Sequence, residues 1–441
     1  MSATLAILDW AELGAERQAE ALRRPTQRDA AGLLERAGRI VSDVRERGDA
    51  ALREYTEQLD GVRLESFVVT AAEFAAAETA LTSEQHAALR RAIGTVTRFH
   101  ETQVLGDVRV ETSPGVVCER MIVPLNAVGL YVPAGTAPLP STAIMLAIPA
   151  RIAGCPVRVL CTPPRRDGTA DPAVLVAARL CGIEQVFKIG GAQAVAAMAY
   201  GTASVPKVDK IFGPGNAWVT AAKQIVATDA LGAALDMPAG PSEVLVIADA
   251  SARPEFVAAD LLAQAEHSED AQVVLVTTSR VLAVACVAEV ERQMAALPRR
   301  AITARSIAES RVLVVADLET ALEVSNRYAP EHLILQVESP RDWLGRVRNA
   351  GSVFLGAWTP ETMGDYCSGT NHVLPTYGHA RAYSGLGVID FVKRITVQEV
   401  TPAGLADLGL TARTLARLES LDAHANAVTV RLEAIAREAG A

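Results

Sequence analysis

The residues best suited to chemistry are histidines and acids in the second half of the chain. Five of the seven histidines follow residue 260. In the stretch APEHL, Glu331 and His332 are adjacent and directly follow Pro330. A neighbouring carboxylate and imidazole can activate water and accept a proton, because an unperturbed histidine titrates at about pH 6.5, near the operating pH. The motif predicts either an acid–base pair at the mouth of a strand or a polar pair in solvent.

A second group of residues has the composition of a metal site. In QAEHSED, Gln264 and His267 are three residues apart, so both side chains can lie on one helix face. We expect Asp365 to lie in a glycine-containing loop, TMGDYCSGTNH, with His372 seven residues later. Oxygen and imidazole ligands suit zinc or manganese. A single QxxH motif is, however, more often an exposed polar helix face than a metal site.

Glu419 and His424 form a pair whose spacing does not fit one helix face. They are five residues apart, which separates them by about 140° on a regular helix. Either the helix bends or begins anew near Ser420, or the two side chains contact different parts of a ligand.

Two glycine turns follow short apolar segments. Gly213-Pro214-Gly215 follows VDKIF and precedes a helix expected to begin near Asn216, a position that suits phosphate at a helix N-terminus. The full GxGxxG fingerprint is missing, because its third position holds Trp218. The stretch Gly190-Gly191-Ala192-Gln193 follows QVFKI and is the same kind of turn. Each is more often a structural turn than a nucleotide site.

The elements around these residues alternate between strands and helices. Residues 28 to about 100 have the 3.6-residue periodicity of helices. Two series of short β-branched runs follow, separated by the turn-rich stretch DMPAGPS at 236–242. The runs cover 157–161, 185–189 and 208–212, and then 244–248, 273–277, 311–315 and 332–336. This alternation predicts an α/β fold with parallel sheets in two lobes, and a site outside the carboxyl ends of the strands.

The chain's composition argues against several functional classes. Lys and Arg number 42 against 51 Asp and Glu, a net charge of −9, which disfavours general nucleic-acid binding. The start MSATLAILDW lacks a secretory pattern, and the best apolar run, 143–153, is interrupted by Pro149 and Arg151 and is too short to span a membrane. We expect a soluble cytoplasmic enzyme without a nucleic-acid or membrane partner.

The six cysteines form no CxxC pair and are expected to be reduced and mostly buried; only Cys367 lies near candidate ligands.

Several long segments, in order along nearly the whole chain, resemble the histidinol dehydrogenase family. Together they are far more specific than any single motif. The segments are VGLYVPAGTAPLPST (128–142), KIGGAQAVAAMAYGT (188–202), KVDKIFGPGNAWVTAAK (207–223), DMPAGPSEVLVIAD (236–249), DLLAQAEHSEDAQVVLVT (260–277), APEHL (329–333) and GSVFLGAWTPETMGDYCSGTNHVLPT (351–376).

The resemblance implies oxidation of L-histidinol to L-histidine through histidinaldehyde, the last step of histidine biosynthesis, with two NAD molecules reduced in succession. It implies one zinc ion per subunit. The zinc ligands would be Gln264, His267, Asp365 and His424. Glu331 and His332 would be the acid–base pair, and Tyr131, Gln193 and Asn216 would contact NAD. Ser242 and Glu419 would hold the substrate, together with Gln264, His267, His332, Asp365 and His424.

The resemblance also implies an order of steps. His332 would accept the hydroxyl proton as hydride leaves to NAD, and Glu331 would then activate water for the second oxidation. The zinc ion would orient the substrate's amine and imidazole nitrogens. His372 matches a position near the substrate without an assigned step, and His379 has no role. The family usually has glycine where this chain has Ala134, so we expect a shifted NAD affinity if that backbone needs a positive φ.

The family's architecture implies two incomplete Rossmann-like lobes with helical segments at both ends. The boundaries expected here are an N-terminal helical segment at 1–23, a first lobe with zinc and catalytic residues at 24–127 and 240–387, a second, NAD-binding lobe at 128–239, and a C-terminal extension at 388–441. The family forms an intertwined homodimer in which this extension completes the neighbour's site. Glu419 and His424 would therefore serve the partner subunit.

Two other functions fit parts of the pattern. A relative on the same scaffold could oxidise another alcohol, such as a sulfonated propanediol, but it would have less use for Glu419 as an acid that recognises imidazole. A non-catalytic binding or assembly protein would be expected to have lost site residues, whereas each position carried over is chemically competent.

Overall fold

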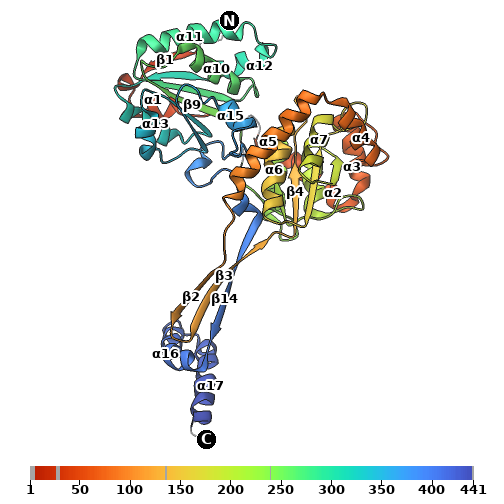
Figure 1. Ribbon diagram of the computed structural model, residues 1–441, viewed down its shortest axis with the longest axis vertical. Coiled ribbons are helices and arrows are strands. Elements are labelled where there is room, and N and C mark those ends of the chain that lie inside the picture. The colour runs from red at the N-terminus through yellow and green to blue at the C-terminus, as the bar shows by residue number, and fades with distance from the viewer. Residues whose placement is uncertain (1–4, 26–29, 135–136, 239, 440–441) are drawn as a thin grey trace. The chain divides into compact units, whose positions relative to one another are not determined.

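The computed structural model describes residues 5–25, 30–134, 137–238 and 240–439, in two units (Figure 1). The first unit comprises residues 1–103 and 125–391, and the second comprises 104–124 and 392–441. Gly135 and Thr136 of the YVPAGT segment and Ala239 of DMPAGPS lie outside the described residues, as do the ends of the expected N-terminal segment (1–4) and C-terminal extension (440–441) and residues 26–29 of the expected first lobe. None of the described helices is long and apolar enough to cross a membrane.

A six-stranded parallel sheet forms one lobe of the first unit. Its order is β1-β11-β10-β9-β12-β13. Successive residues of β9 face opposite layers: Val244 and Val246 pack with α10, α11 and α12, whereas Leu245 and Ile247 pack with α13. This double burial explains the continuous apolar runs in the sequence. The elements are β1 (Ala6–Asp9), α1 (Ala15–Ala21), β9 (Glu243–Ala248), α10 (Pro254–Ala265), β10 (Gln272–Thr277), α11 (Arg280–Met294), α12 (Arg300–Ala308), β11 (Arg311–Val314), α13 (Leu318–Tyr328), β12 (His332–Gln336), α14 (Pro340–Trp343), β13 (Ser352–Leu355) and α15 (Glu361–Tyr366).

A five-stranded parallel sheet forms the other lobe of the first unit, in the order β6-β5-β4-β7-β8. The chain starts at the central strand β4, adds β5 and β6 on one side, and crosses to β7 and β8 on the other. The six-stranded sheet repeats this order from β9. The elements are α2 (Ala30–Arg47), α3 (Asp49–Tyr55), α4 (Ala71–Ala80), α5 (Ser83–Glu101), β4 (Ala127–Tyr131), α6 (Pro140–Ile152), β5 (Val157–Thr162), α7 (Pro172–Leu180), β6 (Gln185–Lys188), α8 (Gly191–Tyr200), β7 (Lys210–Phe212), α9 (Ala217–Thr228) and β8 (Ala234–Leu235).

The α/β fold class is confirmed, but the packing differs from the expected lobe boundaries. Helices α2 to α5 cover the five-stranded sheet, not the six-stranded one to which residues 24–127 were assigned. Ile40, Val41 and Val44 of α2, for example, share a core with Val195 of α8. The N-terminal segment also contains a strand, β1, which pairs with β11. An amphipathic pattern shows that a helix has a buried face without identifying the surface that covers it.

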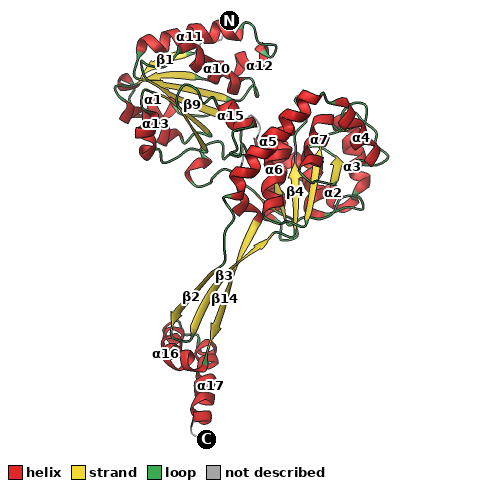
Figure 2. Cartoon of the chain, in the orientation of Figure 1, coloured by secondary structure: helices red, strands yellow, loops and turns green. Residues whose placement is uncertain are grey.

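The second unit combines a three-stranded antiparallel sheet with two helices that pack against each other (Figure 2). Its strands are β2 (Val108–Ser113), β3 (Val116–Pro124) and β14 (Val392–Val400), and its helices are α16 (Pro402–Leu418) and α17 (Asp422–Ala439). The expected extension therefore includes a strand and draws residues 104–124 into the same unit. The helical stretch is broken at Ser420, whose φ of 59° is incompatible with a continuous helix. The alternative of a helix that begins anew near Ser420 is the one observed.

The six cysteines all lie in the described part of the chain and are free thiols. Cys155, Cys161, Cys181 and Cys286 are buried, as expected for small apolar side chains. Cys367 is partly buried and packs at the edge of an apolar cluster.

Candidate active site

Glu331 and His332 lie at the amino end of β12, beside the start of β9. His332 pairs in register with Val244. Both side chains are almost fully buried, at 5% and 4% exposure. Burial contradicts the alternative of a polar pair in solvent. Polar groups buried at the mouth of a central strand need partners or a function.

The main chain of Glu243 orients both side chains. Its N–H donates to Oε2 of Glu331 at 2.9 Å, and its carbonyl oxygen lies 3.1 Å from Nδ1 of His332. Because a carbonyl can only accept, Nδ1 donates to it, and Nε2 is the ring nitrogen left to take up or release a proton. Nε2 has no hydrogen-bond partner among the described residues and lies 3.5 Å from Oδ1 of Asp365. Proton exchange with a ligand would therefore take place at Nε2.

The electrostatics place a proton within the pair near neutral pH. Burial raises the pKa of Glu331 to about 7, and the neighbouring His332 only partly offsets that effect. Burial alone would lower the pKa of His332, but the carboxylates of Glu331 and Asp365 outweigh it and raise that pKa well above its usual value. Buried acids and bases with such shifts are typical of groups that exchange protons in catalysis.

Gln264, in the last turn of α10, is fully buried, and neither Oε1 nor Nε2 has a partner among the described residues. An amide left in this state costs about 1–3 kcal/mol, so it fits a group that receives a ligand better than an exposed polar face. His267 lies two residues beyond the end of α10 and is exposed. Asp365 interacts electrostatically with it. The structure thus brings these three residues to one region of the first unit.

Asp365 lies in the short helix α15, which corrects the expectation of a loop. Pro360 precedes the helix in extended conformation, and the helix ends at Cys367. The carbonyl of Asp365 is 2.8 Å from Nδ1 of His372, and Nε2 of His372 is 3.2 Å from Oγ1 of Thr142 on α6. His372 thereby links α15 to the five-stranded lobe.

A metal ion would need more than these acids and histidines. Across the described ranges, no three His, Cys, Asp or Glu side chains are close enough together to hold a metal ion. The Gln264 amide and a ligand from outside the first unit would complete the set. An amide oxygen without a partner, a carboxylate and an imidazole are donors that suit zinc, so the residues present fit that ion.

A second layer of buried acids was missed from the sequence. Asp260 precedes Gln264 by four residues on α10, and Glu361 precedes Asp365 by four residues on α15. Burial raises the pKa of Asp260 to about 7 and, with the nearby acids, that of Glu361 well above its usual value. Gln336, on β12, donates to Oδ2 of Asp260 at 2.7 Å. The (i, i+4) spacing was visible in the sequence, but the burial was not.

The residues expected to contact NAD lie at the carboxyl edge of the five-stranded sheet. Tyr131 ends β4 and its hydroxyl accepts the N–H of Gly191 at 3.0 Å. Gln193, on α8, is buried with no partner for Oε1 in the described ranges. Asn216 is the N-cap of α9, as the expected helix start implies, and its Oδ1 accepts from Trp218 and Val219. Tyr131 and Asn216 flank the switch point between β4 and β7, where open α/β sheets bind ligands.

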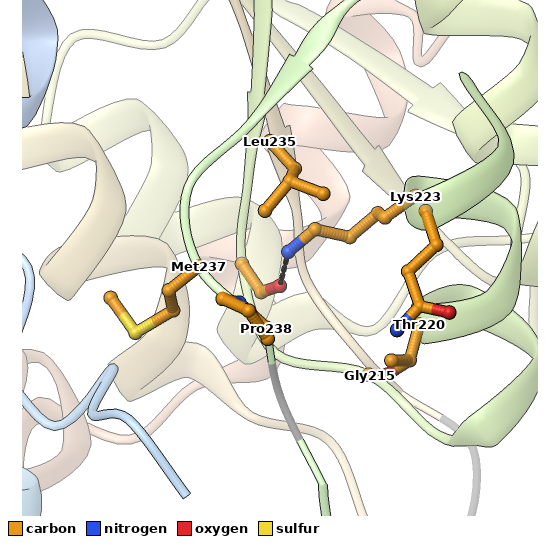
Figure 3. Close-up of a pocket in the computed structure, with 8 residues that line it drawn as sticks. Gly215, Thr220, Lys223, Leu235, Met237 and Pro238 are labelled. Carbon is orange, nitrogen blue, oxygen red and sulfur yellow. Dashed lines mark hydrogen bonds between the residues drawn. The ribbon is translucent and has the colours of Figure 1, made fainter. Parts of the chain in front are cut away.

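The Gly213-Pro214-Gly215 turn is held by a buried ion pair. Lys223 donates to the carbonyl of Gly213 at 3.0 Å (Figure 3) and pairs with Asp236, whose Oδ2 accepts the N–H of Gly213 at 2.8 Å. Gly213 has a φ of 124°, and a Cβ there would lie 2.2 Å from the carbonyl oxygen of Tyr131. Only glycine fits this position.

A pocket lined by residues of both lobes connects this turn to Glu331 of the buried pair. Its lining includes Gly213, Gly215, Ser242, Glu331, His372 and Thr376. Ser242, at the entrance to β9, thus lies at the same pocket as Glu331. Ala134 is not among the described residues with a positive φ, so the alanine carries no backbone strain of the kind considered above.

Glu419 and His424 belong to the second unit and do not share a helix. Glu419 caps the end of α16, and His424 lies in the first turn of α17. Both side chains are exposed. The first unit alone therefore contains only part of the expected ligand set.

The histidinol dehydrogenase family model matches residues 22–432. The chain belongs to this family. It is therefore an enzyme, an oxidoreductase, and its relatives share its full extent. The histidinol dehydrogenase of Xanthomonas axonopodis pv. citri is 58% identical over 97% of this chain and 99% of its own. That of Vibrio parahaemolyticus is 52% identical over 96% of this chain and 97% of its own.

The crystal structure of histidinol dehydrogenase from Elizabethkingia anophelis is similar throughout. It has 42% sequence identity and a TM-score of 0.93, and the match covers 99% of each chain. The similarity includes both parallel sheets and the helices at each end, which supports the same architecture for this member of the family.

In the present chain, the two sheets present opposite edges to the pocket. Gly213 and Gly215 line the pocket just after the carboxyl end of β7, as expected. Glu331 and Ser242 instead precede the amino ends of β12 and β9. The expectation of carboxyl ends alone is therefore correct for one lobe and wrong for the other.

Proposed function

We propose that this enzyme oxidises L-histidinol to L-histidine through histidinaldehyde, with two successive reductions of NAD. The observation that carries the proposal is the buried Glu331–His332 pair, with the free Nε2 of His332 facing Asp365. The names of the relatives support histidinol as the substrate and histidine biosynthesis as the pathway.

His332 serves as the base for the first oxidation. Its Nε2 would accept the proton of the substrate hydroxyl, and NAD, when bound, would supply the acceptor for the hydride that leaves the hydroxyl-bearing carbon. The hydrogen bond from Nδ1 to the Glu243 carbonyl stabilises the imidazolium that forms. A positioned base of this kind is worth about 10²–10⁴-fold in rate.

Glu331 serves the second oxidation. Once the aldehyde has formed, the carboxylate takes a proton from water as the water oxygen bonds to the carbonyl carbon. The resulting hydrate anion would give up a second hydride, for which a second NAD would be the acceptor, and would become the carboxylic acid. A pKa of about 7 for Glu331 matches this task, because the carboxylate can take up a proton and release it at neutral pH.

We propose one zinc ion per subunit, held by Gln264, His267 and Asp365 together with His424 of the partner subunit. When bound, zinc would supply positive charge that orients the amine and imidazole nitrogens of the substrate. Ser242 and Glu419 would add contacts to the substrate, as would His332. The unpartnered oxygen of the buried Gln264 supports this assignment.

NAD would contact Tyr131, Gln193 and Asn216 at the switch point of the five-stranded sheet. The N-termini of α8 and α9 lie at this edge, and helix N-termini favour phosphate. The buried Gln193 oxygen without a partner is a further group that a ligand could satisfy. This lobe would be the NAD-binding lobe, and the six-stranded lobe would hold zinc and the catalytic pair.

We propose a homodimer in which the second unit completes the neighbour's site through Glu419 and His424. The second unit exposes many large apolar side chains, as an interface would. They are Val104, Leu105, Val108, Val110, Met121, Ile395, Val400, Leu408, Leu410, Leu415, Leu418, Leu421 and Val430. We also propose a cytoplasmic location, which the free thiols fit.

The deciding experiment measures NADH formed from L-histidinol and from dihydroxypropanesulfonate, with zinc content determined on the same sample. We expect about two NADH per histidinol and none from the sulfonate. Turnover of the sulfonate alone would replace histidinol by that alcohol. Absence of turnover with either, in zinc-loaded protein, would favour the non-catalytic alternative.

A further inference from the structure

A buried ion pair lies directly behind the Glu331–His332 pair. Nε of Arg24 donates to Oε2 of Glu243 at 2.5 Å, and Nη2 donates to Oε1 at 2.7 Å. The two side chains are 11% and 2% exposed. A two-pronged arginine–carboxylate pair fixes the orientation of both groups, which a lysine cannot do.

The same guanidinium holds the chain that enters β12. Nη2 of Arg24 also donates to the carbonyl oxygens of Tyr328 at 2.8 Å and Ala329 at 3.3 Å. Its guanidinium carbon lies 3.9 Å from the centre of the Tyr328 ring. Ala329 has a φ of 55°, which residues other than glycine rarely adopt. Arg24 therefore helps to hold the bend that delivers Glu331 and His332 to the pocket.

Glu243 connects this ion pair to the site through its own main chain. Its side chain binds Arg24, while its N–H and carbonyl bind Glu331 and His332. We propose that Arg24 is a positioning residue for both steps of the reaction. Arg24 fixes Glu243 on one side of the catalytic pair and the Tyr328–Ala329 main chain on the other. The inference rests on the function proposed above.

Removal of the guanidinium leaves the Glu243 carboxylate buried without its counter-charge, and the Glu243 main chain shifts to relieve it. A displacement of about 1 Å at a reacting group costs about 100-fold in rate. We expect Arg24→Ala to lower kcat by about 10–100-fold with histidinol and, separately, with histidinaldehyde. The rates of both oxidation steps fall because the main chain of Glu243 orients both Glu331 and His332. KM for NAD and zinc content stay close to the wild-type values, because Arg24 touches none of the groups proposed to bind them.

The experiment compares Arg24→Ala and Arg24→Lys with the control Arg23→Ala in the full-length enzyme. Arg23 is the preceding residue, and its exposed side chain pairs with Glu20 across the end of α1. We expect an intermediate kcat for Arg24→Lys and an unchanged kcat for Arg23→Ala. Guanidinium ion, added far below denaturing concentrations, should restore part of the kcat of Arg24→Ala. Urea at the same concentration should not.

Three results separate the possible explanations. An unchanged kcat in folded, zinc-loaded Arg24→Ala overturns the inference. The inference is also overturned if kcat falls, guanidinium ion does not restore it, and zinc content and thermal stability fall as well. That combination identifies a purely structural role for Arg24. If Arg24→Ala does not fold, Arg24→Lys and Glu243→Gln carry the test, since the first keeps the positive charge, the second keeps the side-chain shape, and each removes the two-pronged pair. Wild-type enzyme that forms no NADH from histidinol would refute the proposed function instead.

Discussion

Replacement of Asp260 by asparagine should flatten the pH dependence of stability in the metal-free enzyme. Asp260 is only 6% exposed, and burial raises its pKa from 3.8 to about 7. A raised carboxyl pKa means that the folded state holds the proton more tightly than the unfolded state. The stability contributed by this proton is therefore fully present below about pH 4 and is lost as pH rises through about 7. The total loss is three pKa steps, or about 4 kcal/mol.

Most of that loss occurs in an accessible range. Proton linkage predicts that the free energy of unfolding falls by about 2–3 kcal/mol between about pH 5 and pH 8. The asparagine side chain in the variant cannot ionise, and its oxygen can still accept the hydrogen bond from Gln336. The unfolding midpoint of Asp260→Asn should therefore rise relative to that of wild type by about 2–3 °C over this range.

Thermal unfolding of chelator-treated protein, at matched ionic strength, provides the assay. Asp342→Asn, which removes an exposed carboxylate from the same lobe, serves as the control and should leave the wild-type pH slope intact. If the difference between Asp260→Asn and wild type stays constant from about pH 5 to pH 8, Asp260 does not titrate there. The account of a buried acid layer behind Gln264 would then be refuted.

Three further changes test the proposed site. His332→Asn should lower kcat by about 10²–10⁴-fold while zinc stays bound; loss of zinc would mean that His332 is a ligand and not the base. His424→Ala should weaken zinc binding in a chelator titration, and heterodimers of it with His332→Asn should regain activity; verified heterodimers without activity would count against shared sites. Gly213→Ala should cost about 1–3 kcal/mol of turn stability and raise KM for NAD without changing zinc affinity. Gly154→Ala, also at a positive φ but with open space around its Cβ, should leave KM for NAD alone.

Local signals in the sequence predicted local features well. Pro330 and the apolar run after it placed Glu331 and His332 at the mouth of a strand, where they lie. The spacing of Glu419 and His424 required a break in the helix or separate roles, and the break lies at Ser420. Asn216 was expected at a helix start and is the N-cap of α9. Each of these features depends on residues within a few positions of each other.

Features that depend on distant residues were not predicted. Arg24 and Glu243 are 219 positions apart, and no local pattern marks either as half of a buried pair. The lobe covered by α2 was misjudged for the same reason. Asp260 and Glu361 carry a visible four-residue spacing to Gln264 and Asp365. An acid at that spacing is nevertheless usually solvated, and only the packing of α10 and α15 against the sheet buries them.

The two lobes have the same strand order, yet their pocket-facing edges suit ligands of opposite charge. At the carboxyl edge of the five-stranded sheet, α8 and α9 present their N-termini, whose partial positive charge favours phosphate. At the amino edge of the six-stranded sheet, α10 and α13 present their C-termini, at Gln264 and just before Glu331. Partial negative charge there favours cations and disfavours ionised acids. The proposed zinc ion and the substrate's ammonium group are cations, whereas burial raises the pKa of Glu331 and Asp260 in this lobe. Use of opposite edges would therefore let one strand order supply the proposed anion site in one lobe and the proposed cation site in the other.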